Sequence, residues 1–423
     1  MEYKINDILE VTAYEVDRFG QGVSKVDDII IFTPGLLKDE KAQVTIIDVK
    51  SKFLQAKIKK LLTTSPERKT MTSKLGALDL YHLKDDKQND WQAEITAKEF
   101  KRSLGYEAPL GEVIQSEKTL NYRNKVVYHV LDDEMMRLGL YTTTPIELVE
   151  VHTFILNSHA IQRCIAKIQQ QSIKVDPKVF KHIMLRSNEK EEVLVTLVAY
   201  EKEFTGLKEL VEKIKTFKEV VGITLNIKPN EKTILGNESY TLYGKNELTF
   251  TEGSLKLKIN DRSFMQVNLP VMIKTYERIA SEINGETVID CYSGIGSIGY
   301  FIGKNAKRIV MIESNKENIK MANDLKPYYQ GSFEIRSGLA EQVLPKLDAE
   351  ILVIDPPRAG LHKSLLTVLN QKQFKKIIYL SCELNTLTRD LKVLRETYKL
   401  KEVIPVRMFP QTTSIETLVI LER

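Results

Sequence analysis

One stretch decides the fold and the chemistry that the chain can carry: KKIIYLSCELNTL, residues 375–387. Its apolar run, Ile377–Leu380, has the length and composition of a buried strand. Leucines then recur at helical spacing, and Asn385 or Thr386 is the expected N-cap of a helix. Cys382 therefore lies where a strand ends and a helix is about to begin.

Two interpretations of Cys382 are open at this point. A thiol beside a helix N-terminus meets partial positive charge, which favours the nucleophilic thiolate. The alternative is a small, inert, buried side chain, since free cysteine is among the most buried residue types. Its position at a strand end does not distinguish a nucleophilic Cys382 from an inert one, so the flanking sequence is needed.

The stretch belongs to a region of alternating strands and helices that begins near Phe264. The expected strands span residues 287–289, 308–312, 333–336, 351–354 and 377–380, and an antiparallel pair, 401–408 and 415–421, closes the chain. This alternation is typical of an α/β doubly wound, Rossmann-like sheet, which binds its ligand at the carboxyl ends of the strands.

The first strand–helix turn of this region carries a GxGxxG pattern, residues 294–299. Gly294 allows a ligand to approach the backbone, and Glu313, at the end of the next strand, can bind the hydroxyls of a ribose. A nicotinamide dinucleotide and S-adenosylmethionine both fit the pattern. Asp290 and the later Asp355-Pro-Pro-Arg stretch favour S-adenosylmethionine, because an acidic residue and a rigid turn suit a target base beside a sulfonium.

The last element with possible chemistry is FPQT, residues 409–412, followed by Glu416. Taken singly, Glu416 is a strand carboxylate that faces water. Taken together with Cys382 and Asp355, it completes a site, since all three fall at the same edge of the predicted sheet.

The rest of the chain predicts two further domains. Residues 1–62 contain short strands separated by turns, which suggest a small β-barrel; the lysines of its last strand either protect a sheet edge or contact RNA. Residues 63–262 alternate strands and helices as an α+β central domain, after a polar excursion at residues 63–90. Residues 263–423 form the doubly wound domain.

Composition bounds these predictions. The 423 residues are 42% apolar and 28% charged, as in ordinary soluble proteins, and the net charge of +5 is too small to establish nucleic-acid binding. Three cysteines at long spacing exclude a disulfide framework and a zinc ribbon. Because no apolar window reaches the length of a membrane span, we expect a cytoplasmic protein without a membrane partner.

The catalytic half resembles the RNA uracil-C5 methyltransferases, the family of the 23S rRNA and tRNA m5U enzymes. The matching stretches are FMQVN (264–268), DCYSGIG (290–296), IDPPRAGL (354–361), LSC (380–382) and FPQT (409–412) through Glu416. YRNK (122–125) matches the central segment of the family, and the first ~60 residues resemble its TRAM barrel.

The resemblance implies a class I methyltransferase fold that takes S-adenosylmethionine and uridine in RNA. It assigns Cys382 as the nucleophile and Glu416 as the base, with the methyl donor bound by Gln266, Tyr292, Gly294, Glu313 and Asp355. Thiolate addition at C6 of uracil activates C5, and a base must then remove the C5 proton. The barrel favours 23S rRNA as the target, and we expect the enzyme to act as a monomer.

Three positions depart from the family. Cys291 and Ser293 stand where Leu and Cys are usual, and Leu339 replaces an acidic residue near the adenine end of the donor site. Many relatives carry four cysteines for an iron–sulfur cluster in the excursion. Residues 71–82 here contain none, so the sequence predicts neither a cluster nor any other metal site.

Three other functions compete with the leading one. A uridine-C5 methyltransferase acting on tRNA shares the same site. A nicotinamide oxidoreductase leaves Cys382 and Glu416 without a role. A non-catalytic RNA-binding protein uses the barrel and central domain only, and methyl transfer to uridine in naked transcript excludes it.

Overall fold

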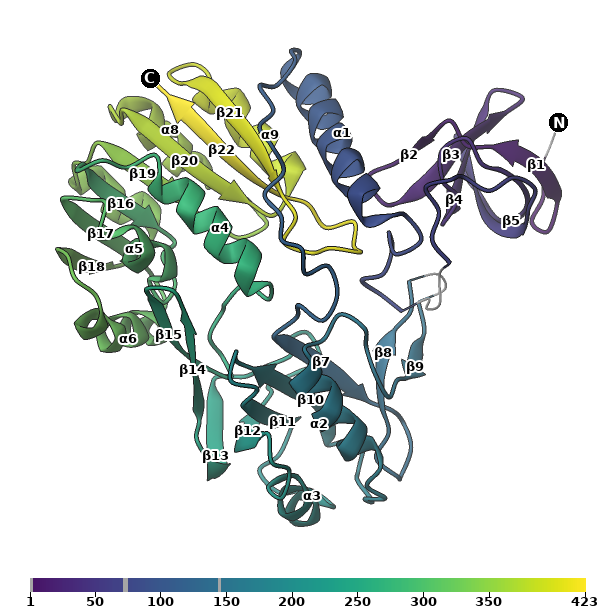
Figure 1. The fold of residues 1–423 in the computed structure, drawn as a ribbon, viewed down its shortest axis with the longest axis horizontal. Helices are drawn as coiled ribbons and strands as arrows, with labels where there is room; N and C mark the ends of the chain where they lie inside the picture. Colours follow the sequence, from purple (N-terminus) through teal and green to yellow (C-terminus); the bar gives the residue numbers. More distant parts are fainter. Residues whose placement is uncertain (1–2, 71–74, 144–145) are drawn as a thin grey trace. The chain divides into compact units, whose positions relative to one another are not determined.

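The computed structural model describes residues 3–70, 75–143 and 146–423, coloured along the chain in Figure 1. It forms two compact units. The first comprises Met1–Glu99, Tyr141–Glu147 and Phe409–Ile415, and the second comprises Phe100–Leu140, Leu148–Met408 and Glu416–Arg423. The segment Phe409–Ile415 therefore belongs to the first unit although the residues on both sides of it belong to the second.

The first unit is built on a six-stranded sheet with the order β1-β5-β6-β4-β3-β2. Its strands are β1 (Ile8–Thr12), β2 (Glu15–Val16), β3 (Gln21–Val26), β4 (Ile29–Pro34), β5 (Lys41–Val49) and β6 (Phe53–Leu61). Alternate residues of these strands, including Ile31, Val44 and Ile46, point into one apolar core. Because β1 also lies against β3, the sheet curls into the small barrel that the strand pattern predicts.

The excursion after the barrel is tied back to it by a buried ion pair. Arg68 donates through Nε and Nη2 to both carboxylate oxygens of Glu40, each at 2.6 Å. Leu78, Leu80 and Leu83 are buried behind this pair. Residues 71–74 of the predicted excursion lie outside the described residues.

Helix α1 (Asp85–Leu104) has its first turn within the stretch 63–90 that the sequence analysis assigned to a polar excursion. Asp85 and Asp86 occupy its first turn, where negative charge favours a helix N-terminus. The apolar periodicity starts only at Trp91, so it does not show this first polar turn.

The second unit contains the central sheet, with the order β13-β12-β11-β10-β7-β8-β9. The strands are β7 (Lys125–Val130), β8 (Leu138–Tyr141), β9 (Leu148–Glu150), β10 (Phe180–Ser187), β11 (Val193–Ala199), β12 (Val220–Ile227) and β13 (Glu238–Gly244). Helix α2 (His159–Gln169) packs on β10 and β11 and buries Cys164 in the core, while α3 (Leu207–Ile214) connects β11 to β12. The hairpin β14 (Glu247–Glu252) and β15 (Leu255–Asn260) leads to the next sheet.

The catalytic sheet has the order β18-β17-β16-β19-β20-β22-β21, drawn from green to yellow in Figure 1. It consists of β16 (Thr287–Cys291), β17 (Arg308–Glu313), β18 (Phe333–Ser337), β19 (Ile351–Ile354), β20 (Lys376–Ser381), β21 (Lys399–Val406) and β22 (Glu416–Glu422). Its helices are α4 (Leu269–Ala280), α5 (Ser297–Ile302), α6 (Lys316–Leu325), α7 (Ala340–Val343), α8 (Lys363–Gln371) and α9 (Leu384–Leu394). Five parallel strands and a closing antiparallel pair confirm the predicted doubly wound sheet.

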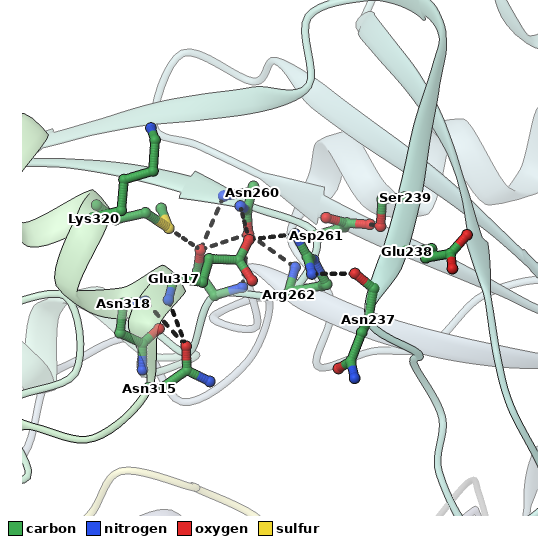
Figure 2. Close-up of polar contacts among 12 residues, drawn as sticks. Asn237, Glu238, Ser239, Asn260, Asp261, Arg262, Asn315, Glu317, Asn318 and Lys320 are labelled. Atoms are coloured by element: carbon green, nitrogen blue, oxygen red, sulfur yellow. Dashed lines mark hydrogen bonds and ion pairs between the residues drawn. The ribbon is translucent and has the colours of Figure 1, made fainter. Parts of the chain in front are cut away.

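Arg262, after β15, joins the central sheet to the catalytic sheet within the second unit (Figure 2). Its guanidinium donates to the backbone carbonyl of Asn237, before β13, and to Glu317 of α6 at 2.6 Å. Asn315 caps α6 by accepting from the backbone N–H of Glu317 at 2.9 Å and of Asn318 at 3.2 Å. These contacts fix the first turn of α6 beside the end of β17.

Candidate active site

Four of the seven predicted site residues line one pocket of the second unit. Gln266, Tyr292, Gly294 and Asp355 share it with Phe264, Tyr276 and Asn318. Tyr292 and Gly294 come from the turn after β16, and Asp355 directly follows β19, the neighbouring strand. The pocket therefore opens at the carboxyl edge of the sheet, where doubly wound folds bind ligands.

The backbone of the turn after β16 leaves room for a ligand. Gly294 has φ of 56°, and a Cβ added to it meets no heavy atom within 4 Å. Tyr292 also adopts positive φ, 64°, which is uncommon for a residue with a side chain. The turn thus presents a glycine backbone and an aromatic ring to the pocket, which suits a ligand with a flat ring.

Glu313, at the end of β17, does not line the pocket but holds its wall. One carboxylate oxygen accepts from the backbone N–H of Gly294 at 2.9 Å, and the other accepts from Ser314 at 2.8 Å and Asn315 at 2.6 Å. The carboxylate thereby ties the turn after β16 to the start of α6. Of its roughly four acceptor positions three are used, so one on Oε2 remains for a hydroxyl donor.

Gln266 is carried by a loop that the central sheet holds in place. Asn124, the third residue of the YRNK motif, donates from Nδ2 to the backbone carbonyl of Gln266 at 3.1 Å, and its N–H donates to the carbonyl of Val267 at 3.1 Å. The family resemblance includes the YRNK motif but implies no role for it. Its role is to fix the pocket wall that bears Gln266.

Strand register brings the remaining residues to the same edge. Ser381 of β20 pairs with Thr417 of β22, so Cys382 and Glu416 follow and precede this pair on adjacent strands. Ile354 of β19 pairs with Tyr379 of β20, which places Asp355 on the next strand end. The expected edge site of Asp355, Cys382 and Glu416 thus comes from three neighbouring strands.

Helix α9 begins earlier than expected from the sequence. Its N-cap is Glu383, whose carboxylate accepts from the backbone N–H of Asn385 at 3.4 Å, and not Asn385 or Thr386. The leucine spacing alone did not show that Leu384 is the first helical residue. Cys382 therefore stands immediately before the N-cap.

The prediction that this position favours the thiolate is wrong for the ligand-free protein. Burial raises the pKa of Cys382, and the carboxylates of Glu416 and Asp355 raise it further, while Arg358 opposes them. Desolvation and two acidic neighbours outweigh the helix N-terminus. The thiol is half-buried, in contrast to the fully buried Cys164 and Cys291.

Three carboxyl groups at this edge, those of the buried Glu416 and Asp290 and of the partly exposed Asp355, have strongly raised pKa values. Burial raises the pKa of Glu416 to about 8, with Asp355 contributing, and burial raises that of Asp355 to about 7. Burial also raises the pKa of Asp290 to about 8, although its carboxylate accepts from the Gly299 N–H at 2.9 Å. Such shifts are typical of acid–base sites.

Tyr276, on α4, is a site residue that the sequence did not reveal. Its hydroxyl lies 3.0 Å from Oγ of Ser297, at the start of α5, and the ring lines the pocket. Asp355, Asp290 and Glu416 add to the burial that raises its pKa. A tyrosine on an apolar helix face gives no signal of such a role, because it is indistinguishable from a core residue.

Asp290→Asn tests the raised carboxyl pKa values in the absence of ligand. The unfolded carboxyl ionises near the ordinary 3.8 and the folded one near 8, so between these pH values the folded state keeps a proton that the unfolded state has lost. The free energy of unfolding therefore falls as the pH rises across this window, by up to about 1.4 kcal/mol per pH unit. Asparagine removes this titration and retains an acceptor for Gly299.

We expect the melting temperature of Asp290→Asn, relative to wild type, to rise steadily from pH 5 to pH 8 in circular dichroism scans. A difference between the two proteins that is the same at both pH values would contradict a raised pKa for Asp290.

Within residues 3–70, 75–143 and 146–423, no helix is both long and apolar enough to cross a membrane. Among the same residues, no group of three or more His, Cys, Asp or Glu side chains has the arrangement of a metal site.

Comparison with known proteins gives two family matches. Residues 331–423 match the model described as tRNA (Uracil-5-)-methyltransferase, and residues 4–59 match the TRAM domain. The first match covers the strands that carry Asp355, Cys382 and Glu416.

Relatives and solved structures span the whole chain. An uncharacterised RNA methyltransferase of Enterococcus faecalis is 30% identical over 99% of this chain and 98% of its own length, and one of Lactobacillus johnsonii is 28% identical over 99% of both. The crystal structure of Pyrococcus abyssi tRNA (uracil-54, C5)-methyltransferase, in complex with S-adenosyl-L-homocysteine, has a TM-score of 0.76 at 22% identity. It covers 98% of this chain and 100% of that one, and thus shows the same fold.

Proposed function

The chain belongs to the RNA uracil-C5 methyltransferase family, and on this premise we propose that it methylates C5 of a uridine in 23S rRNA through a covalent bond from Cys382. The observation that carries the proposal is the meeting of Cys382, Glu416 and Asp355 at the ends of three adjacent strands. The proposed enzyme acts in the cytoplasm as a monomer.

The pocket beside β16 suits S-adenosylmethionine as the methyl donor. Tyr292 and Phe264 offer aromatic surface, Gln266 offers an amide, and the open backbone at Gly294 leaves space. The Asp355 carboxylate provides the acidic group that a sulfonium or an ammonium requires. When bound, S-adenosylmethionine supplies an electrophilic methyl group.

Cys382 and Glu416 divide the remaining chemistry between them. Cys382 reacts as the thiolate, which its raised pKa makes the minor form at neutral pH, and its sulfur forms a bond to C6 of the uracil. The electrons of the C5–C6 double bond then move toward C5 and make that carbon nucleophilic. After methyl transfer, Glu416 accepts the proton of C5, the double bond re-forms, and Cys382 leaves as the thiolate. The target base has to leave its stack to reach both groups.

Glu416 is suited to this role by its surroundings. It is buried, and its Oε2 has no hydrogen-bond partner among the described residues. Burial, with the nearby Asp355, raises the pKa of Glu416 to about 8, which makes its carboxylate a stronger base than a solvated one.

By the family resemblance, the barrel at the N-terminus favours 23S rRNA as the target. The structural likeness to a tRNA (uracil-54, C5)-methyltransferase favours tRNA as the second candidate. A strain that lacks this gene distinguishes the two. We expect mass spectrometry to find 5-methyluridine missing at a site in 23S rRNA, and purified enzyme to restore it in an unmodified transcript.

Loss of 5-methyluridine from tRNA alone would transfer the assignment to the second candidate. An enzyme that methylates neither transcript, in the presence of S-adenosylmethionine, would overturn the proposed function.

A further inference from the structure

The loop Phe409–Ile415, which joins β21 to β22, is held by a buried pair of glutamines. The backbone N–H of Gln411 donates to Oε1 of Gln88 at 2.9 Å, and Nε2 of Gln88 donates to Oε1 of Gln411 at 2.8 Å. Both side chains are buried. Gln88 lies on α1, in the same compact unit as this loop, although more than three hundred residues separate the two in sequence.

Gln88 also fixes the segment before α1. The two hydrogens of its Nε2 are shared among several acceptors, which include the backbone carbonyl oxygens of Leu80 at 3.1 Å and Leu83 at 2.8 Å. The N–H of Leu80 donates to the carbonyl of Gln411 at 3.0 Å. One side chain thus links the excursion to the loop. Gln411 completes the network by donating from Nε2 to Asp85 at 2.9 Å.

The loop adopts a conformation that requires this support. Gln411 has φ of 72°, a left-handed conformation that is unfavourable for a residue with a side chain. Beyond it, Thr412 donates from Oγ1 to the carbonyl of Phe409 at 2.9 Å and accepts from the N–H of Ser414 at 3.1 Å. The backbone is therefore defined by hydrogen bonds as far as Ser414.

Glu416 stands two residues beyond Ser414, at the first position of β22, where its backbone pairs with Val406 of β21 and the loop ends. Because its Oε2 has no hydrogen-bond partner among the described residues, that oxygen depends for its place on the backbone that carries it. A displacement of about 1 Å in a catalytic group lowers the reaction rate on the order of a hundredfold.

We propose that Gln88 is a positioning residue for the proton-removal step: it holds the loop Phe409–Ile415 so that Glu416 reaches the C5 proton. This inference rests on the proposed function of Glu416 as the base. Gln88 itself is not among the residues that line the proposed donor pocket.

The test substitutes Gln88→Met, which keeps the length of the side chain and removes its hydrogen bonds. We expect methylated RNA to be released roughly 10-fold to 100-fold more slowly. The methylated covalent enzyme–RNA complex should accumulate, as seen on denaturing gels, while the affinities for RNA and S-adenosylmethionine change less than about twofold. The double variant Gln88→Met/Glu416→Gln should release RNA no more slowly than Glu416→Gln alone, because the two residues act on one step.

Thr96→Val is the matched control. Thr96 is buried on the same helix, and its hydroxyl donates to the carbonyl of Gln92 within that helix at 2.8 Å. This variant should release product at the wild-type rate. Gln88→Leu, which also removes the hydrogen bonds without placing a charge against the surrounding carbonyl oxygens, should show the same slow release and serves if the methionine variant does not fold.

Three outcomes would overturn the inference. Folded Gln88→Met could release methylated RNA at the wild-type rate, or it could lose the same factor in every reaction step and in RNA affinity. In the third outcome, the double variant would release RNA more slowly than Glu416→Gln alone. Each of them leaves the proposed function intact, provided that the wild-type enzyme makes 5-methyluridine. Absence of methylation by the wild type would instead remove the proposed function itself.

Discussion

Cys382→Ala is expected to lower the rate of uridine methylation by at least about a thousandfold, the loss that follows removal of a covalent nucleophile. The affinity for S-adenosylmethionine should change less than about twofold, because Cys382 does not line the donor pocket. Single-turnover methylation of transcript and equilibrium binding of the donor measure the two quantities separately. Residual methylation above about a thousandth of the wild-type rate would argue against covalent catalysis.

Cys291→Ala is the control for this prediction. Cys291 ends the neighbouring strand β16 and is buried, and burial raises the pKa of its thiol. Because Cys291 is buried whereas Cys382 is half-buried, it is a thiol near the site that a substrate base cannot reach. We expect this variant to retain methylation within about tenfold of wild type, and a loss as large as that of Cys382→Ala would remove the distinction between the two cysteines.

Glu416→Gln is expected to stop the reaction after methyl transfer. Glutamine has the shape of glutamate but does not accept the C5 proton, so Cys382 remains bonded to C6. A methylated covalent protein–RNA complex should accumulate to near one equivalent, while turnover falls by at least about a hundredfold. Denaturing gels with a radiolabelled methyl donor show both the bond to protein and the transferred methyl group.

Asp355→Asn separates this effect from a general loss of the site. Asp355 lines the donor pocket, so its substitution should weaken donor binding and should not trap a methylated complex. Wild-type turnover in Glu416→Gln would exclude Glu416 from the mechanism.

The arrangement of Asp355, Cys382 and Glu416 was predictable because it depends on strand order. Each residue adjoins a strand whose apolar run is visible in the sequence, and parallel strands bring their carboxyl ends to one edge. The antiparallel β22 was placed beside β20 by its position in the closing pair. The apolar periodicity of the strands and their order in the sheet were therefore sufficient to bring these three residues to one edge.

The state of the Cys382 thiol was not predictable from the same pattern. The helix N-terminus is local and visible in the sequence, whereas burial and the charges on Glu416 and Asp355 come from other strands. The contacts of Gln88 with Gln411 and of Asn124 with the Gln266 loop were missed for the same reason. Each joins residues more than one hundred positions apart, and a polar side chain in a helix or loop does not indicate its distant partner.

The central claim is that Cys382 bonds to C6 of the target uracil. RNA with 5-fluorouridine at the target position tests it most directly, because fluorine at C5 cannot be removed as a proton and the adduct persists. The protein is incubated with this RNA and S-adenosylmethionine, digested, and examined by mass spectrometry. The account predicts a methylated fluorouridine nucleotide on the peptide that contains Cys382. A nucleotide attached to another residue, or no adduct under conditions in which unmodified RNA is methylated, would contradict it.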